Sequence, residues 1–272
     1  MSNPVDSVQG PCVLSVRGLS KSFGGVRAAS DVTFDAREGE ITALIGPNGA
    51  GKTTVFNLMT NIFPYEGEVR FDGRDIKGLS PIQVAQSGLI RTYQSARVFP
   101  GMTVLENVLM GRHRLLKSAP LSQFFWGRSS RREEADLRRR AEGLLDLVDL
   151  LKERDTHAVD LPMGAQKLLE VVRALMSQPR LLCLDEPAAG LNDRETEDLA
   201  VLLEAVRASG VPVLLVEHNM GLVMGVADQV VVLDAGAVIG RGTPDEIRRD
   251  ERVIQAYLGR EDHAGEEDHA TA

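Results

Sequence analysis

Two kinds of short hydrophobic run follow one another along the chain. In the first kind apolar and polar side chains alternate, which is typical of antiparallel strands with one exposed face; these runs are residues 13–16, 32–36 and 68–73. The second kind is almost continuously apolar, as in strands buried on both faces of a parallel sheet; these runs are residues 41–46, 181–186 and 211–218, and a closing pair follows at 229–242. The pattern predicts an α/β fold, with a parallel-sheet core and an antiparallel β layer at its N-terminal end.

Between about residues 100 and 160 the hydrophobic period becomes helical. Residues 103–116 and 131–153 repeat apolar side chains at helical spacing, and the second stretch is strongly charged on its exposed side. We expect a helical subdomain over about residues 95–165. The charge cluster at 128–140 is more typical of a solvated helix face than of a binding site.

The two ends of the chain differ from its middle. We expect residues 1–11 to be flexible. From Arg260 the sequence REDHAGEEDHATA is polar and poor in apolar residues, which predicts a disordered acidic tail over 260–272. The folded domain is then residues 12–259, and a chain of 272 residues with 43% hydrophobic content can bury a substantial core.

Charge and cysteine content restrict the class of protein. A net charge of −8 disfavours a nucleic-acid partner, because such a partner needs a basic surface. Cys12 and Cys183 are far apart and lack metal-ligand spacing, so we expect both to stay reduced. No apolar run approaches the roughly 18 residues of a membrane span, and the N-terminus lacks a signal-peptide pattern. These features favour a cytosolic protein, which would serve a membrane from its surface or through partners.

A glycine-rich motif follows the first of the buried runs. Residues 46–53, GPNGAGKT, fit G-x-x-x-x-G-K-[ST] and lead into a helical stretch, so backbone N–H groups would converge on phosphate oxygens. Lys52 would reach the β- and γ-phosphates, and Thr53 would hold Mg²⁺. A chance glycine-rich turn is the alternative, and the strand before the motif and the helix after it disfavour that. The predicted phosphate-binding residues are Gly46, Pro47, Asn48, Gly49, Ala50, Gly51, Lys52, Thr53 and Thr54.

The other two buried runs also end in polar residues. In LLCLDEP, Asp185 is placed to bind Mg²⁺, and Glu186 is placed as general base or to orient the attacking water. In VPVLLVEH, His218 is a candidate to contact the γ-phosphate. Carboxylates that cap the next turn, and a histidine with a purely structural hydrogen bond, are the alternatives. Parallel sheets bind ligands beyond the carboxyl ends of their strands, so all three motifs are expected at one site.

This order of motifs resembles the ATP-binding subunits of ABC transporters. LPMGAQKLLEVVRAL, residues 161–175, lies just upstream of the DEP strand, and LPMGA occupies the place of the ABC signature, usually LSGGQ. The resemblance covers about residues 12–259. It implies the ABC-type fold of P-loop NTPases. It also implies an ATPase that works as a head-to-tail dimer, in which Gly164 contacts the γ-phosphate of the ATP bound to the facing subunit.

Three further positions match the family residue by residue. Phe23 in KSFGG lies where an aromatic ring stacks on adenine. Gln94 in RTYQ corresponds to the glutamine that touches Mg²⁺ and the attacking water and links the site to the helical subdomain. Asn192 in AAGLN lies in the D-loop, where many members carry Asp. A core aromatic, a surface amide and an ordinary turn are the alternatives.

Finer features resemble one subfamily, the ATP-binding subunits of branched-chain amino acid importers. They are GLIRTYQSARVFPGMTVLENVLMG, EPAAGLN and the ending VIQAYLG. The resemblance implies two membrane permease subunits, a second ATPase subunit that is a paralogue or a second copy, and a periplasmic solute-binding protein as indirect partner. It also implies a peripheral position on the cytoplasmic face of the inner membrane. Related importers carry amides, urea or other amino acids, so the solute stays open.

The signature departs from the family pattern. Pro162 replaces Ser, Met163 replaces the first Gly, and Ala165 replaces Gln, so a hydroxyl donor is lost. One hydrogen bond to a charged group contributes about 1.5–3 kcal/mol, which weakens a site without abolishing it. A weakly hydrolysing regulatory module is therefore an alternative, although Lys52 and Glu186 are intact. A soluble ABC ATPase of translation or repair is another, but the chain lacks a second cassette, a long coiled coil or a zinc hook.

Overall fold

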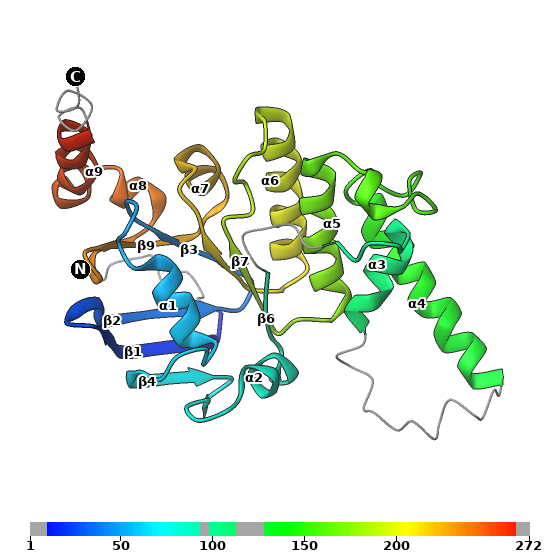
Figure 1. Ribbon diagram of the computed structural model, residues 1–272, viewed down its shortest axis with the longest axis horizontal. Helices are drawn as coiled ribbons and strands as arrows, with labels where there is room; N and C mark the ends of the chain where they lie inside the picture. The colour runs from blue at the N-terminus through cyan, green and yellow to red at the C-terminus, as the bar shows by residue number, and fades with distance from the viewer. Residues whose placement is uncertain (1–9, 93–97, 113–127, 265–272) are drawn as a thin grey trace, which may run out of the picture.

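The computed structural model describes residues 10–92, 98–112 and 128–264. Gln94, the predicted Mg²⁺-contacting glutamine, lies outside the described residues, as do residues 1–9 and 265–272. In the described part of the chain the strands form two sheets, and helices pack between and around them (Figure 1).

The first sheet is antiparallel, as the alternating runs predict. Its strands, in the order β2-β1-β4-β5, are β2 (Val26–Arg37), β1 (Cys12–Phe23), β4 (Glu66–Phe71) and β5 (Arg74–Asp75). Along β1, buried Leu14 and Val16 alternate with half-buried Ser15 and exposed Arg17. One face of this sheet is therefore apolar, and it packs against α1 (Lys52–Met59), which lies between the two sheets.

The second sheet contains the three continuously apolar runs as neighbouring strands. Its order is β10 (Ala237–Gly242), β9 (Gln229–Asp234), β3 (Ile41–Ile45), β8 (Val213–Val216), β7 (Leu181–Asp185) and β6 (Leu89–Arg91). All neighbours from β9 to β6 pair in parallel, and only β10 is antiparallel. Every residue of β3, β7 and β8 is buried. The predicted parallel core is confirmed, and β6 is a strand too short for the pattern to reveal.

The helix that follows the degenerate signature connects two hydrophobic cores. This helix, α5 (Met163–Met176), buries Leu168, Val171 and Leu175 against the parallel sheet, α6 (Asp193–Ala208) and α7 (Met220–Val226). Its other face packs with α3 (Val104–Met110) and α4 (Arg128–Asp146). In Figure 1 α3 and α4 lie at one end of the molecule, next to α5. The smaller elements are α2 (Pro81–Ser87), the 3₁₀ turn Ala158–Asp160, α8 (Pro244–Ile247) and α9 (Glu251–Ala264).

Two predicted boundaries are wrong. The helix expected over 131–153 ends at Asp146, because Asp149 adopts φ +55° and the Leu150 N–H bonds back to the Leu145 carbonyl, which returns Leu150 to the core. The acidic tail predicted as disordered from residue 260 is helical to Ala264, because its Arg, Glu and Ala residues are good helix formers. Among the described residues, none of the helices is both long and apolar enough to cross a membrane.

Candidate nucleotide-binding site

The glycine-rich loop joins β3 to α1 and passes very close to two other backbones. A Cβ on Gly46 would lie 2.2 Å from the Leu233 carbonyl oxygen, and one on Gly51 would lie 2.4 Å from that of Ala28. Both glycines have positive φ, +152° and +100°, so a side chain there meets strain as well as a clash. Gly51 caps α1 without a side-chain hydrogen bond, which leaves the first N–H groups of the helix for a ligand.

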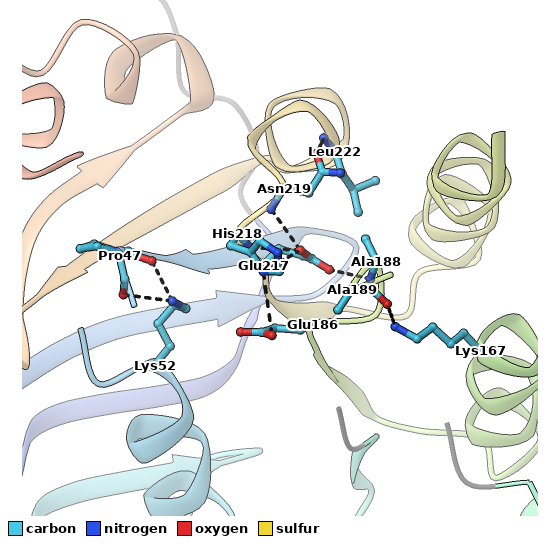
Figure 2. A network of polar contacts seen from close by, with 11 residues as sticks. Pro47, Lys52, Lys167, Glu186, Ala188, Ala189, Glu217, His218, Asn219 and Leu222 are labelled. Carbon is cyan, nitrogen blue, oxygen red and sulfur yellow. Dashed lines mark hydrogen bonds and ion pairs between the residues drawn. The ribbon is translucent and has the colours of Figure 1, made fainter. Parts of the chain in front are cut away.

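Lys52 is folded back into this loop. Its Nζ donates hydrogen bonds to the carbonyl oxygens of Gly46, at 2.7 Å, and Pro47, at 3.2 Å (Figure 2). Burial lowers the pKa of Lys52, while the carboxylates of Glu186, Asp185 and Glu217 raise it. The ammonium group is thus held inside the loop, in a field of carboxylates that favours its charged form.

A cavity of about 680 Å³ opens beside the loop. Of the predicted residues, the consecutive run from Asn48 to Thr54 and Glu186 line it, whereas Gly46 and Pro47 contribute through the carbonyl groups that hold Lys52. The lining residues that the sequence did not reveal are Val26, Arg27, Ala28, Ala235 and Gly236. They come from the start of β2 and the β9–β10 turn, where the Gly236 N–H donates to the Ala50 carbonyl at 3.0 Å.

Phe23 lies apart from that lining. Its ring packs edge-on against Phe63, with centroids 5.4 Å apart, and Lys21 Nζ lies 5.3 Å from the Phe23 centroid. The ring is 40% exposed. The structure therefore places β2 residues, rather than Phe23, against the cavity, and the predicted stacking on adenine stays a prediction.

Asp185, at the end of β7, has one carboxylate oxygen engaged and one available. Its Oδ2 accepts a hydrogen bond from Arg91 Nη2 at 2.7 Å. Its Oδ1 is buried and has no hydrogen-bond partner among the described residues. An orphaned carboxylate oxygen, together with the Thr53 hydroxyl at the cavity, is an all-oxygen donor set of the kind that Mg²⁺ prefers. The residues present therefore fit the predicted magnesium ion.

Arg91 is a residue that the sequence analysis did not identify, and it connects β6 to α1 and β7. The Nη1 of Arg91, which lies in β6, donates to Asn57 Oδ1 at 2.7 Å and to Thr60 Oγ1 at 3.3 Å, both at the C-terminal end of α1. The Arg91 guanidinium also lies over the Phe56 ring. The side chains of Arg91 and Asp185 are only 8% and 2% exposed, so this ion pair is buried. Its only trace in the sequence is an arginine three residues before Gln94.

Replacing Arg91 by Met is expected to lower the free energy of unfolding by about 3–5 kcal/mol, because Asp185 is left as an uncompensated buried charge. Urea unfolding of the purified, nucleotide-free chain measures the change. The matched control is Arg70→Met, which removes the solvent-exposed pair with Glu68 and is expected to leave the free energy of unfolding nearly unchanged. Similar small losses from both substitutions would contradict the structural importance of the buried pair.

Glu186 lines the cavity, and His218 lies close to it without being part of the lining. Glu186 lies in the turn after β7 at φ +49°, its N–H donates to the Val216 carbonyl at 2.9 Å, and its side chain lines the cavity. His218 follows β8 by one residue, and its Nδ1 lies 3.9 Å from Glu186 Oε2, which is too long for a hydrogen bond. The His218 side chain is 55% exposed. Two residues far apart in the sequence thus lie close together, and their side chains do not hydrogen-bond each other.

The signature segment lies on another part of the surface. Pro162 precedes α5 without a side-chain cap, and Gly164 is buried where an added Cβ would meet the Glu195 carboxylate at 2.2 Å. Gly164 does not line the cavity described above, and its contact with the nucleotide of a facing subunit stays a prediction. Asn192, predicted in the D-loop, caps α6, with its Oδ1 accepting from the Glu195 N–H at 3.0 Å.

A P-loop at the end of a buried parallel strand, with Asp185 and Glu186 closing a nearby strand of the same sheet, defines a P-loop nucleotide-binding protein. The family described as ABC transporter matches residues 29–189, and the family described as branched-chain amino acid ATP-binding cassette transporter matches residues 237–263. The chain belongs to the ABC transporter family.

Individual relatives extend this likeness over nearly the whole chain. The high-affinity branched-chain amino acid transport ATP-binding protein BraF of Pseudomonas aeruginosa is 43% identical over 249 residues, which cover 91% of this chain and 98% of BraF. The corresponding protein LivG of Escherichia coli K12 is 42% identical over the same shares of both chains. A solved nucleotide-free ATP-binding cassette from an ABC transporter is 30% identical, with a TM-score of 0.76 over 91% of this chain and 99% of that one.

These findings confirm three of the predictions. The resemblance to ABC transporter ATP-binding subunits, the ABC-type P-loop fold, and ATP hydrolysis coupled to transport are all supported by the family and its members. The roles assigned to individual site residues and the limits of the helical subdomain are not tested by them and stay predictions.

Proposed function

We propose that this chain is the ATP-hydrolysing subunit that powers import of branched-chain amino acids. The observation that carries the proposal is its similarity to BraF over 98% of that protein's length, together with the match of residues 237–263 to the branched-chain family. Importers of amides or urea, and a regulatory module that hydrolyses little, are the alternatives.

In the proposed reaction, each part of the site has a separate task. The N–H groups at the start of α1 and the Lys52 ammonium bind the phosphates. Thr53, the unpartnered oxygen of Asp185 and Gln94 would hold Mg²⁺, which would neutralise charge on the phosphate oxygens. Glu186 takes the proton of the attacking water. His218 donates a hydrogen bond that keeps the γ-phosphate in place.

The partners follow from the same proposal. Two permease subunits form the membrane path, and a second ATPase subunit, a paralogue or a second copy, faces this one head to tail. Gly164 of this chain then completes the site of the facing subunit, and the signature of that subunit completes the site built on Lys52. A periplasmic solute-binding protein delivers the amino acid, and the chain lies on the cytoplasmic face of the inner membrane.

We expect the surface around residues 95–110, downstream of Gln94, to bind a cytoplasmic helix of a permease. Within the described part of it, Phe99 and Glu106 are exposed. Cysteines placed at these two positions, in a background where exposed Cys12 is Ser, are expected to crosslink to cysteines on the co-expressed permease. Arg70→Cys on β4 is the control and should not crosslink. Crosslinks at β4 with none across 95–110 would refute this docking surface.

The test of the proposed function is co-purification followed by ATP turnover. The chain is isolated with its membrane partners, and hydrolysis is measured with the solute-binding protein and one solute at a time: leucine, isoleucine, valine, urea or acetamide. Stimulation by the three amino acids supports the proposal. Stimulation by urea or acetamide alone favours an importer of those solutes, and absence of turnover favours the regulatory module.

A further inference from the structure

Glu217 is a buried carboxylate to which the proposed reaction gives no task. It follows β8 directly and precedes His218, and its side chain is 0% exposed. Its Oε1 accepts a hydrogen bond from the Ala188 N–H at 2.7 Å, and its Oε2 accepts from the N–H groups of His218, at 3.0 Å, and Asn219, at 3.2 Å (Figure 2). The two oxygens therefore hold two different segments of backbone.

The surroundings of Glu217 compensate its charge. A buried carboxylate is tolerated only when hydrogen bonds or opposite charges replace the lost water. Figure 2 shows Glu217 between Lys52 on one side and Lys167 on the other. Burial lowers the pKa of both lysines, and Glu217 is among the carboxylates that raise it. The three N–H groups satisfy both oxygens of this buried side chain.

The turn after β7 is held from two sides. Glu217 binds the N–H of Ala188, and Lys167 Nζ of α5 donates to the carbonyl oxygen of the next residue, Ala189. This turn begins with Glu186, the predicted general base. A shift of the turn would therefore move Glu186 relative to the cavity.

The second segment that Glu217 holds carries His218. The N–H groups of His218 and Asn219 both donate to the same oxygen, and Asn219 in turn caps α7 through the Leu222 N–H at 3.0 Å. Since Glu186 and His218 do not hydrogen-bond each other at 3.9 Å, their side chains do not set their own separation. Besides the hydrogen bond from the Glu186 N–H to the Val216 carbonyl, the Glu217 carboxylate links the backbone of Ala188, two residues after Glu186, to that of His218.

We propose that Glu217 is a positioning residue, which fixes the turn carrying Glu186 and the segment carrying His218 relative to each other. This inference rests on the proposed function, because it assigns Glu217 to the geometry of the same hydrolytic site. The described hydrogen bonds of Glu217 all come from backbone N–H groups, and Glu217 does not line the cavity.

The test is Glu217→Gln in the purified transporter complex. The amide keeps the shape but offers one acceptor oxygen, so either the bond to Ala188 or those to His218 and Asn219 must be lost. We expect kcat for ATP hydrolysis to fall about tenfold or more, because a hydrogen bond to a charged group is broken. The KM for ATP should stay within about twofold, since Lys52 and the start of α1 are unchanged and their binding is uniform.

The matched control is Asp228→Asn. Asp228 Oδ2 also accepts a backbone N–H, that of Ile41 at 2.8 Å, but at the opposite end of β3 from the P-loop. Its substitution should leave kcat and KM within about twofold of the wild-type values. If Glu217→Gln does not fold, Lys167→Met replaces it, because it releases the other side of the same turn, at Ala189. A severalfold loss of kcat at unchanged KM is then expected.

Each outcome decides between two answers. A fall in kcat with unchanged KM, absent from Asp228→Asn, supports the positioning role. Three results would overturn the positioning role: a wild-type kcat in Glu217→Gln, an equal fall of kcat in Asp228→Asn, or a change in KM alone. When Lys167→Met is tested instead, a wild-type kcat in that variant overturns it too. Absence of turnover in the wild-type complex contradicts the proposed function itself, whereas normal wild-type turnover with an unaffected variant removes only the role of Glu217.

Discussion

Glu186→Gln is expected to lower the turnover of the assembled complex by about 10²–10⁴-fold, the range that a general base contributes. The amide cannot accept the proton of the attacking water, yet it keeps the size of the side chain that lines the cavity. Binding of ATP should persist, because Lys52 and the N–H groups of α1 are untouched. The variant is therefore expected to accumulate as an ATP-bound dimer.

Single-turnover hydrolysis and equilibrium binding of a fluorescent ATP analogue separate these two effects. Glu68→Gln on β4 is the control, because it makes the same chemical change at an exposed carboxylate in the other sheet. Its turnover should equal that of the wild type. Hydrolysis by the Glu186→Gln complex at the wild-type rate would remove Glu186 from the chemistry.

Lys52→Ala is expected to reduce turnover of the transporter more than the same change in the partner ATPase. We expect this difference because the signature of this chain is degenerate: Pro162, Met163 and Ala165 replace the usual Ser, Gly and Gln. In addition, no side chain caps α5. If the partner carries a fuller signature, the Lys52 site is completed by more donors than the partner's own site. A missing hydrogen bond to a charged group then predicts a roughly tenfold or greater asymmetry in γ-phosphate stabilisation.

Turnover of complexes that carry one lysine substitution at a time measures this asymmetry. The loss should be concentrated in the Lys52→Ala complex. The companion variant is Pro162→Ser, which supplies the hydroxyl of the usual signature and should raise hydrolysis at the partner's site. A greater loss from the partner's substitution would show that Pro162 and Ala165 do not impair the site they face. In a homodimer both sites carry the same signature, so no asymmetry arises.

The parts of the site that lie within one continuous segment were predictable from the sequence. The unbroken apolar character of β3, β7 and β8 predicted a parallel core, and a motif directly after such a strand has its position fixed by that strand. Lys52, Asp185 and Glu186 were found in this way. Local hydrogen bonding and burial decide these features, and both leave a periodic trace in the chain.

Contacts between distant segments left no such trace. Arg91 and Asp185 are 94 positions apart and pair only because β6 and β7 are neighbours in the sheet. The sequence shows Glu217 only as a polar residue at the end of a strand, and its hydrogen bond with the Ala188 N–H becomes visible only in the folded structure. The start of β2 lines the cavity beside the β9–β10 turn because these distant segments pack together, which the sequence does not reveal. Phe23 packs on the ring of Phe63 instead.

If the proposed function is correct, ATP hydrolysis by this chain drives import of branched-chain amino acids. Uptake of radiolabelled leucine tests it most directly, in proteoliposomes that hold the purified transporter with ATP on the side of this chain and the solute-binding protein on the other. We expect leucine uptake that requires ATP, is competed by isoleucine and valine but not by urea, and is abolished by Glu186→Gln. Uptake that continues with Glu186→Gln, or an ATP-driven complex that carries urea and no leucine, would contradict it.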